Sequence, residues 1–116
     1  MGLIDPMVLM AACGGDPAMR RKMCRRLQSL VPEDLAAVRD ALHAQDAPRL
    51  REAAHKLYGT LSAFSTVAGN VASDLEDYAA QGQLEEAQPL VKRLETLTQE
   101  LMRLVGGLSL EALRRL

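Results

Sequence analysis

The chain has 116 residues and a formal net charge of -1, which is the size of one domain without a strongly basic surface. A general nucleic-acid-binding role is therefore not expected, because such proteins neutralise phosphates with a basic face. With one Phe, two Tyr and no Trp, the core must be filled by Leu, Ala, Val and Met.

Two Asp-Pro pairs predict the first two helices, because Asp caps a helix and Pro is tolerated in its first turn. Asp5-Pro6 starts a short helix through Ala12, which Gly14-Gly15 ends. Asp16-Pro17 starts the next helix. Pro32 lies inside that pattern and marks either a kink or a new start. The apolar positions on the two sides of this proline are Met19, Met23, Leu27 and Leu30, then Leu35, Val38, Ala41 and Leu42.

Three further signals divide the second half of the chain. Asp46 is the expected N-cap of a helix that starts at Ala47-Pro48, and Ser65-Thr66 offers a break and a fresh N-cap. Gly82 ends the helix that follows, and Gly106-Gly107 is expected to end the last long helix. The stripe of that last helix, spaced by three and four, is Leu84, Ala87, Val91, Leu94, Leu101 and Val105.

No segment alternates as a strand does, so the sequence predicts an all-α fold. Four main helices with short connections favour an antiparallel four-helix bundle with a short extra N-terminal helix and a possible short C-terminal helix. We expect residues 1–107 to form the bundle. Residues 108–116 are either a short amphipathic helix or a C-terminal tail, frayed or leading into a linker.

The expected location is the cytoplasm, and no membrane association is predicted. The N-terminus lacks the pattern of a signal peptide, and no apolar run approaches the ~20 residues of a membrane span. Cys13 and Cys24 form no CxxC pair, which favours two buried or half-buried thiols in a reducing compartment over a disulfide. No Cys cluster joins His43 and His55, so no metal site is predicted.

The segment around His55 reads as a helix whose apolar side is complete without its histidine. At about 100° per residue, His55 lies about 160° from Leu57, opposite the core. Gly59 lies one turn on, beside His55, although Gly in a helix costs about 1 kcal/mol against Ala. An exposed imidazole beside a glycine suggests a histidine that a large partner must reach. The apolar face around Leu57 consists of Leu50, Ala53, Ala54, Leu61 and Phe64.

Ala54-His55-Lys56-Leu57-Tyr58-Gly59 resembles the A-H-x-L-K-G pattern of the histidine-containing phosphotransfer (HPt) domain of two-component phosphorelays. Residues 11–16 are similar to the family's C-G-G-D type of turn, and Leu75-Glu76 to its L-E pair. The resemblance covers most of residues 5–105 and implies that His55 carries a phosphoryl group between receiver domains.

The sequence departs from the family pattern at two positions. Tyr58 stands where the family usually has a Lys that supports the phosphoryl group or the partner, and Ser65 stands where it usually has Gly. Arg51 lies one turn before His55 and about 40° from it, so our hypothesis is that Arg51 supplies the missing charge. Lys56 is a second contributor in this hypothesis.

The resemblance also implies the partners of this signal-transduction protein. They are the receiver domains of response regulators and a hybrid sensor histidine kinase, and the chain is expected to act as a monomer with no cofactor of its own. Mg²⁺ would come with the receiver. The expected docking face comprises Arg51, Glu52, Lys56, Gly59 and Ser62, with Tyr58 either on this face or covering the core edge. No ATP-binding motif is present, so no autonomous kinase activity is expected.

Several other interpretations remain open at the level of sequence. His55 could be an ordinary surface histidine, and Gly59 a tolerated glycine or a site of close helix packing. The basic residues between Arg20 and Arg26 are either a solvated face or a guide for an acidic receiver. The whole chain could instead be an adaptor that binds a receiver without transferring phosphate, or a structural bundle that dimerises.

Overall fold

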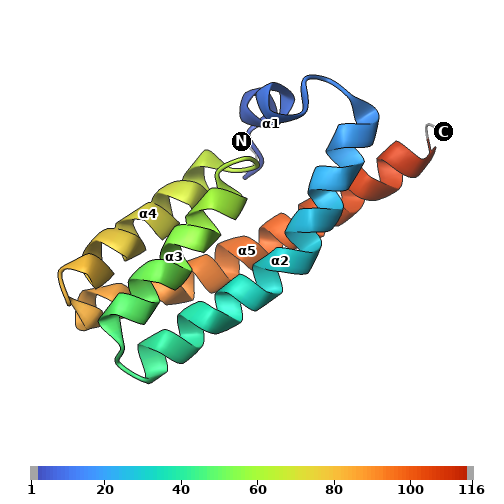
Figure 1. Ribbon diagram of the computed structural model, residues 1–116. Helices are drawn as coiled ribbons and strands as arrows, with labels where there is room; N and C mark the ends of the chain where they lie inside the picture. The colour runs from blue at the N-terminus through green and yellow to red at the C-terminus, as the bar shows by residue number, and fades with distance from the viewer. Residues whose placement is uncertain (1–2, 115–116) are drawn as a thin grey trace.

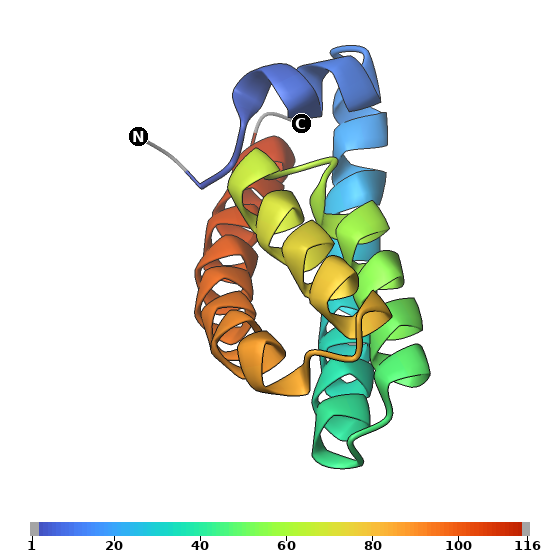
Figure 2. The ribbon, with the colours of Figure 1, turned by 90° about the vertical axis from the view of Figure 1, so that its left-hand side faces the viewer.

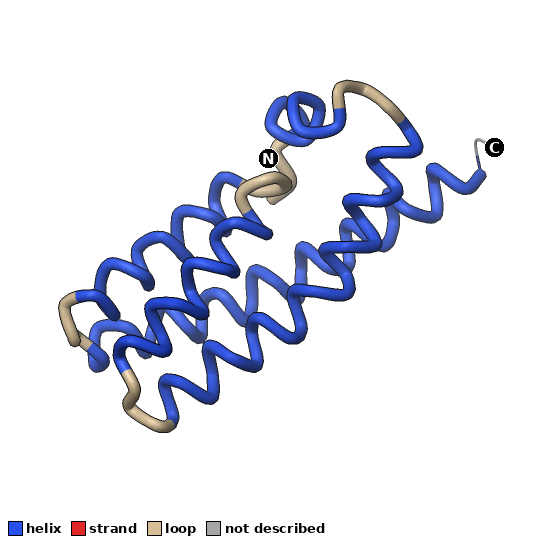
Figure 3. Tube along the Cα trace, in the orientation of Figure 1, coloured by secondary structure: helices blue, strands red, loops and turns tan. Residues whose placement is uncertain are grey.

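The computed structural model describes residues 3–114, and the side chains of residues 3–107. These residues form five helices and no strand, which confirms the predicted all-α class (Figure 3). The helices are α1 (Pro6–Cys13), α2 (Pro17–His43), α3 (Ala47–Leu61), α4 (Thr66–Ala80) and α5 (Leu84–Arg114). None of the described helices is both long enough and apolar enough to cross a membrane.

The four longer helices form an antiparallel bundle in which α3 packs on α2 and α4, and α5 closes the ring against α2 and α4 (Figure 1). α1 lies across one end of this bundle, as the view turned by 90° shows (Figure 2). The loop between α3 and α4 fixes it there, because the amide of Asp5 donates to the carbonyl of Phe64 at 2.7 Å. The hydroxyl of Thr66 donates to the carboxylate of Asp5 at 3.0 Å.

The predicted helix starts are confirmed at the atomic level. Asp5, Asp16 and Asp46 each accept hydrogen bonds from backbone amides of the first turn of α1, α2 and α3. Ser65 is completely buried, and its hydroxyl oxygen accepts from the amide of Ala68 at 3.1 Å. Ser65, one of the two departures from the pattern that the sequence resembles, therefore caps α4, which gives this departure a structural role.

Pro32 does not end the second helix, since α2 is continuous from residue 17 to residue 43 and changes direction along its length (Figure 1). The expectation that Gly106-Gly107 ends the last helix is wrong. α5 runs through both glycines to Arg114, so residues 108–114 continue it rather than forming a separate helix or a tail. The last two positions of the predicted tail, 115 and 116, lie outside the described residues.

The core lies along the bundle axis and consists almost entirely of aliphatic side chains. Its largest fully buried members include Leu50, Leu57 and Leu61 of α3 and Leu75 of α4. Every apolar residue predicted for the buried side of α3 is at most 6% exposed. This face fixes the rotation of α3, and it therefore determines which residues of the helix meet solvent.

Candidate functional site

His55 lies at the middle of α3 on the side turned away from the core. Its neighbours Ala54 and Leu57 are fully buried, whereas the side chain of His55 is 70% exposed. The predicted orientation is therefore confirmed. Because a helix turns by about 100° per residue, the burial of Leu57 alone forces His55 outward.

The imidazole of His55 is held by a carboxylate from the neighbouring helix. Its Nδ1 lies 3.1 Å from Oε1 and 3.2 Å from Oε2 of Glu76 on α4. An ionised carboxylate only accepts hydrogen bonds, so Nδ1 carries the proton that it donates to Glu76. In the neutral ring this leaves the lone pair on Nε2, the other ring nitrogen. The arrangement presents a nucleophilic nitrogen on an exposed, oriented ring.

Two cations lie beside this pair. Arg51 and Lys56 line the same shallow pocket as His55 and Glu76, with a volume of about 480 Å³. Glu52 and Pro48 complete its wall. Among residues 3–107, neither Arg51 nor Lys56 forms an ion pair within 4.0 Å. Both charges are therefore available to an anion placed over His55.

The structure separates the remaining predicted residues from this pocket. Gly59 faces open space, because a Cβ added to it would meet nothing within 4 Å, which excludes close packing as its role. Tyr58 is 38% exposed and does not line the pocket. Ser62 is half-buried, with its Cα 3.3 Å from the position that a Cβ on Gly69 would occupy. The glycine that permits close helix packing is thus Gly69, and Ser62 faces α4.

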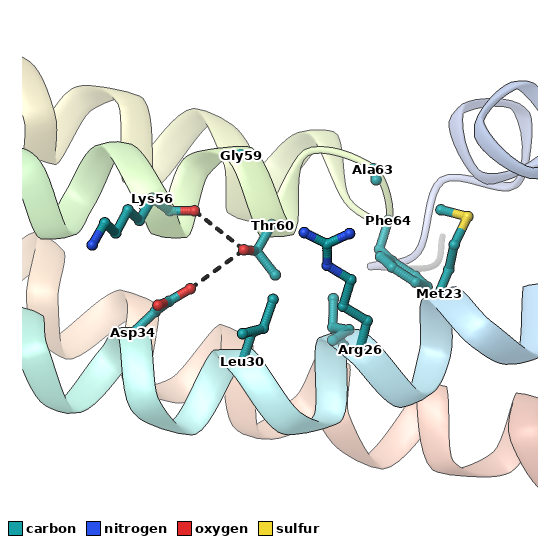
Figure 4. Close-up of a pocket in the computed structure, with 10 residues that line it drawn as sticks. Met23, Arg26, Leu30, Asp34, Lys56, Gly59, Thr60, Ala63 and Phe64 are labelled. Carbon is teal, nitrogen blue, oxygen red and sulfur yellow. Dashed lines mark hydrogen bonds between the residues drawn. The ribbon is translucent and has the colours of Figure 1, made fainter.

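A second and larger groove of about 630 Å³ begins at Lys56 and runs between α2 and α3 (Figure 4). Lys56 lines both hollows, so the groove lies next to the His55 pocket. Its polar members are Arg26, Asp34, Thr60 and Lys56. Its apolar members are Met23, Leu27, Leu30, Ala63 and Phe64.

Asp34 is the one carboxylate among the residues that line this groove. The hydroxyl of Thr60 lies 3.3 Å from Oδ2 of Asp34 and 3.2 Å from the carbonyl of Lys56 (Figure 4). Partial burial raises the pKa of Asp34 above its usual value, and the hydrogen bond from Thr60 and the charge of Lys56 oppose that shift. The desolvation of this carboxylate is therefore the larger influence.

Sequence reasoning gave no role to Glu76 or Asp34. Glu76 belongs to the Leu75-Glu76 pair that carried part of the family resemblance, but its contact with His55 depends on how α3 and α4 pack. Asp34 follows Pro32, in a stretch interpreted only as a possible break. The other predicted features lie elsewhere. His43 is exposed at the end of α2, Cys13 and Cys24 are buried free thiols, and only Arg26 of the basic run lines the groove.

Comparisons with protein-family models and with solved structures each find a match to this chain. The model of the Hpt domain family matches residues 22–104. The crystal structure of histidine-containing phosphotransfer protein B (HptB) from Pseudomonas aeruginosa PAO1 superposes with a TM-score of 0.86 at 24% sequence identity. The match covers 97% of this chain and 96% of that chain, and it shows a shared fold. No curated protein sequence matches the chain significantly.

Proposed function

Because the chain belongs to the Hpt domain family, whose members are phosphotransfer intermediates of two-component phosphorelays, we propose that His55 is the residue that carries the phosphoryl group. It accepts the group from the phospho-aspartate of one receiver domain and passes it to the aspartate of another. The observation that carries this proposal is the exposed imidazole whose Nδ1 is engaged by Glu76 at 3.1 Å. No other histidine in the chain has the motif residues around it.

The transfer needs only one nucleophile from this chain. The Nε2 lone pair of His55 forms a bond to phosphorus while the bond from phosphorus to the aspartate oxygen breaks, and the receiver keeps its carboxylate. The phosphorylated ring retains the proton on Nδ1 and is cationic, which strengthens its contact with the Glu76 carboxylate. Attack by the second aspartate reverses these changes. Since positioning and charge neutralisation dominate phosphoryl transfer, we propose that Mg²⁺ is supplied by the receiver.

Arg51 and Lys56 are the candidate supports of the phosphoryl oxygens. Both line the pocket of His55, which supports the hypothesis that they replace the Lys for which Tyr58 stands in this chain. Glu52 lies in the same pocket and Gly59 faces open space, consistent with a receiver that docks here. Ser62 faces α4 and would meet a partner only at the edge of this face.

We also propose the context of the relay. A hybrid sensor kinase supplies the donor receiver, a response regulator supplies the acceptor, and this chain takes part as a monomer. The two free buried thiols, Cys13 and Cys24, suit a reducing compartment such as the cytoplasm.

Transfer from a panel of phosphorylated receivers tests the proposal. The expected result is an acid-labile, alkali-stable label on the wild-type chain and none on His55→Gln. His43→Gln is the matched control, because it removes the chain's other histidine, and it should be labelled as wild type is. Binding of receivers by wild type without any label would instead favour an adaptor that does not transfer phosphate.

A further inference from the structure

The Asp34 carboxylate is incompletely satisfied within the groove between α2 and α3. Its oxygens can accept several hydrogen bonds, but the contact found is with one hydroxyl, that of Thr60 at 3.3 Å. That hydroxyl has a single proton, and the carbonyl of Lys56 lies 3.2 Å from the same oxygen. The donor is therefore shared, and Asp34 depends on solvent for most of its hydrogen bonds.

No cation of the described part of the chain forms an ion pair with Asp34, although the charge of Lys56 acts on it from a greater distance. Arg26 of α2 and Lys56 of α3 line the groove with it, and Glu33 adds a like charge from the same helix. None of the ion pairs within 4.0 Å involves Asp34. In Figure 4, Arg26 reaches from α2 toward α3 without contacting the carboxylate.

The groove lies where a partner at His55 would cover it. Lys56 lines both the groove and the His55 pocket, and Gly59, which lines the groove, adds no side chain that would keep a partner away. The apolar side chains that line the groove lose contact with water when a partner's apolar surface fills it, and this burial favours binding. Filling the groove in this way also removes water from the Asp34 carboxylate. A covered carboxylate that lacks a donor costs far more free energy than an exposed one, so the partner must supply the donor.

We propose that Asp34 is a specificity-determining residue, which selects receivers that place a Lys or Arg side chain against it in the groove between α2 and α3. This inference rests on the proposed phosphotransfer function. It adds a requirement on the partner's side chains that His55 chemistry alone does not impose. Receivers with an apolar or acidic side chain at the facing position are rejected, because they leave the carboxylate buried without a partner.

The first test measures KM and kcat for transfer from each receiver that phosphorylates the wild-type chain. Asp34→Asn removes the charge with little change in shape, and Asp40→Asn is the control, an exposed Asp of α2 outside the groove. We expect Asp34→Asn to raise KM by about 10- to 100-fold, the range for a hydrogen bond to a charged group. The kcat at saturation should change little, and Asp40→Asn should match wild type.

The second test exchanges the charges. Each Lys and Arg on the receiver's docking surface is replaced in turn by Glu, and every variant is assayed against wild type and Asp34→Lys. One receiver variant is expected to transfer poorly with the wild-type chain because its KM is raised. With Asp34→Lys, the kcat/KM of the same receiver variant should recover at least tenfold. A purely structural role of Asp34, or a swing of Lys56 or Arg26 onto it, predicts no such rescue.

The outcomes separate the two claims. If wild type transfers and Asp34→Asn keeps the wild-type KM for every receiver, the role of Asp34 is overturned while the phosphotransfer function stands. Equal losses with all receivers and no charge-exchange rescue overturn it too. If wild type accepts phosphate from no receiver, the proposed function fails and the selectivity of Asp34 fails with it.

Discussion

Removing the Glu76 carboxylate should slow phosphotransfer without removing the nucleophile. The contact of Glu76 with Nδ1 of His55 is 3.1 Å, a normal hydrogen-bond length. A hydrogen bond to a charged group contributes about 1.5–3 kcal/mol in a buried site. Here the His55 side chain is 70% exposed and that of Glu76 is 24% exposed, so solvent screening reduces the effect. A value of about 0.5–1 kcal/mol, typical of exposed pairs, corresponds to roughly 2- to 5-fold in rate.

The assay is kcat/KM for transfer from one phosphorylated receiver, followed by rapid quench. Glu76→Ala should show the full loss, whereas Glu76→Gln should lose less because its amide oxygen still accepts from Nδ1. Asp77→Ala is the control, since it removes an exposed carboxylate from the adjacent position of α4. If Glu76→Ala transfers as fast as Asp77→Ala and wild type, the orientation of the ring by Glu76 contributes nothing and this reasoning is refuted.

Three further predictions concern the same surface. Gly59→Ala should raise the free energy of unfolding by about 0.5–1 kcal/mol, because the added Cβ meets open space. Gly69→Ala should lower it by about 1 kcal/mol or more, because the added Cβ crowds the backbone of Ser62. Urea unfolding of both variants measures these shifts, and equal shifts would contradict the packing account. Burial raises the pKa of Asp34, so ionisation is less favourable in the folded state than in the unfolded one. Asp34→Asn should therefore stabilise the fold at pH 7, by less than about 1 kcal/mol, and the difference should shrink as the pH falls through the raised pKa of Asp34 and be nearly gone below about 4. Unfolding curves at pH 7 and 3.5 measure this, and a constant difference would contradict it. Arg51→Ala should slow transfer about 2- to 5-fold at low salt and less at high salt, as measured by single-turnover transfer, and wild-type rates at low salt would refute its role.

The helices and the exposure of His55 were predictable because they depend on local rules. Capping by Asp5, Asp16 and Asp46 involves residues two or three positions apart, and the helical period alone places His55 opposite Leu57. The error at Gly106-Gly107 has a physical origin as well. A glycine weakens a helix by only about 1 kcal/mol, so the pair did not end α5, which runs on to Arg114.

The partners of His55 were less predictable because they come from other helices. Glu76 is 21 positions away in the chain and reaches Nδ1 only through the packing of α4 on α3. Asp34 lies 26 positions from Thr60, and its place in the groove depends on how far α2 continues past Pro32. The sequence does contain both carboxylates, but the helical period cannot rank them above other exposed acids.

Long-range ¹H–¹⁵N NMR of the phosphorylated chain identifies the atom that holds the phosphoryl group. We predict phosphorus on Nε2 of His55 with the proton retained on Nδ1, where Glu76 accepts it. Phosphorylation on Nδ1 of His55, on His43 or on a side chain that is not histidine would contradict the proposed phosphotransfer site.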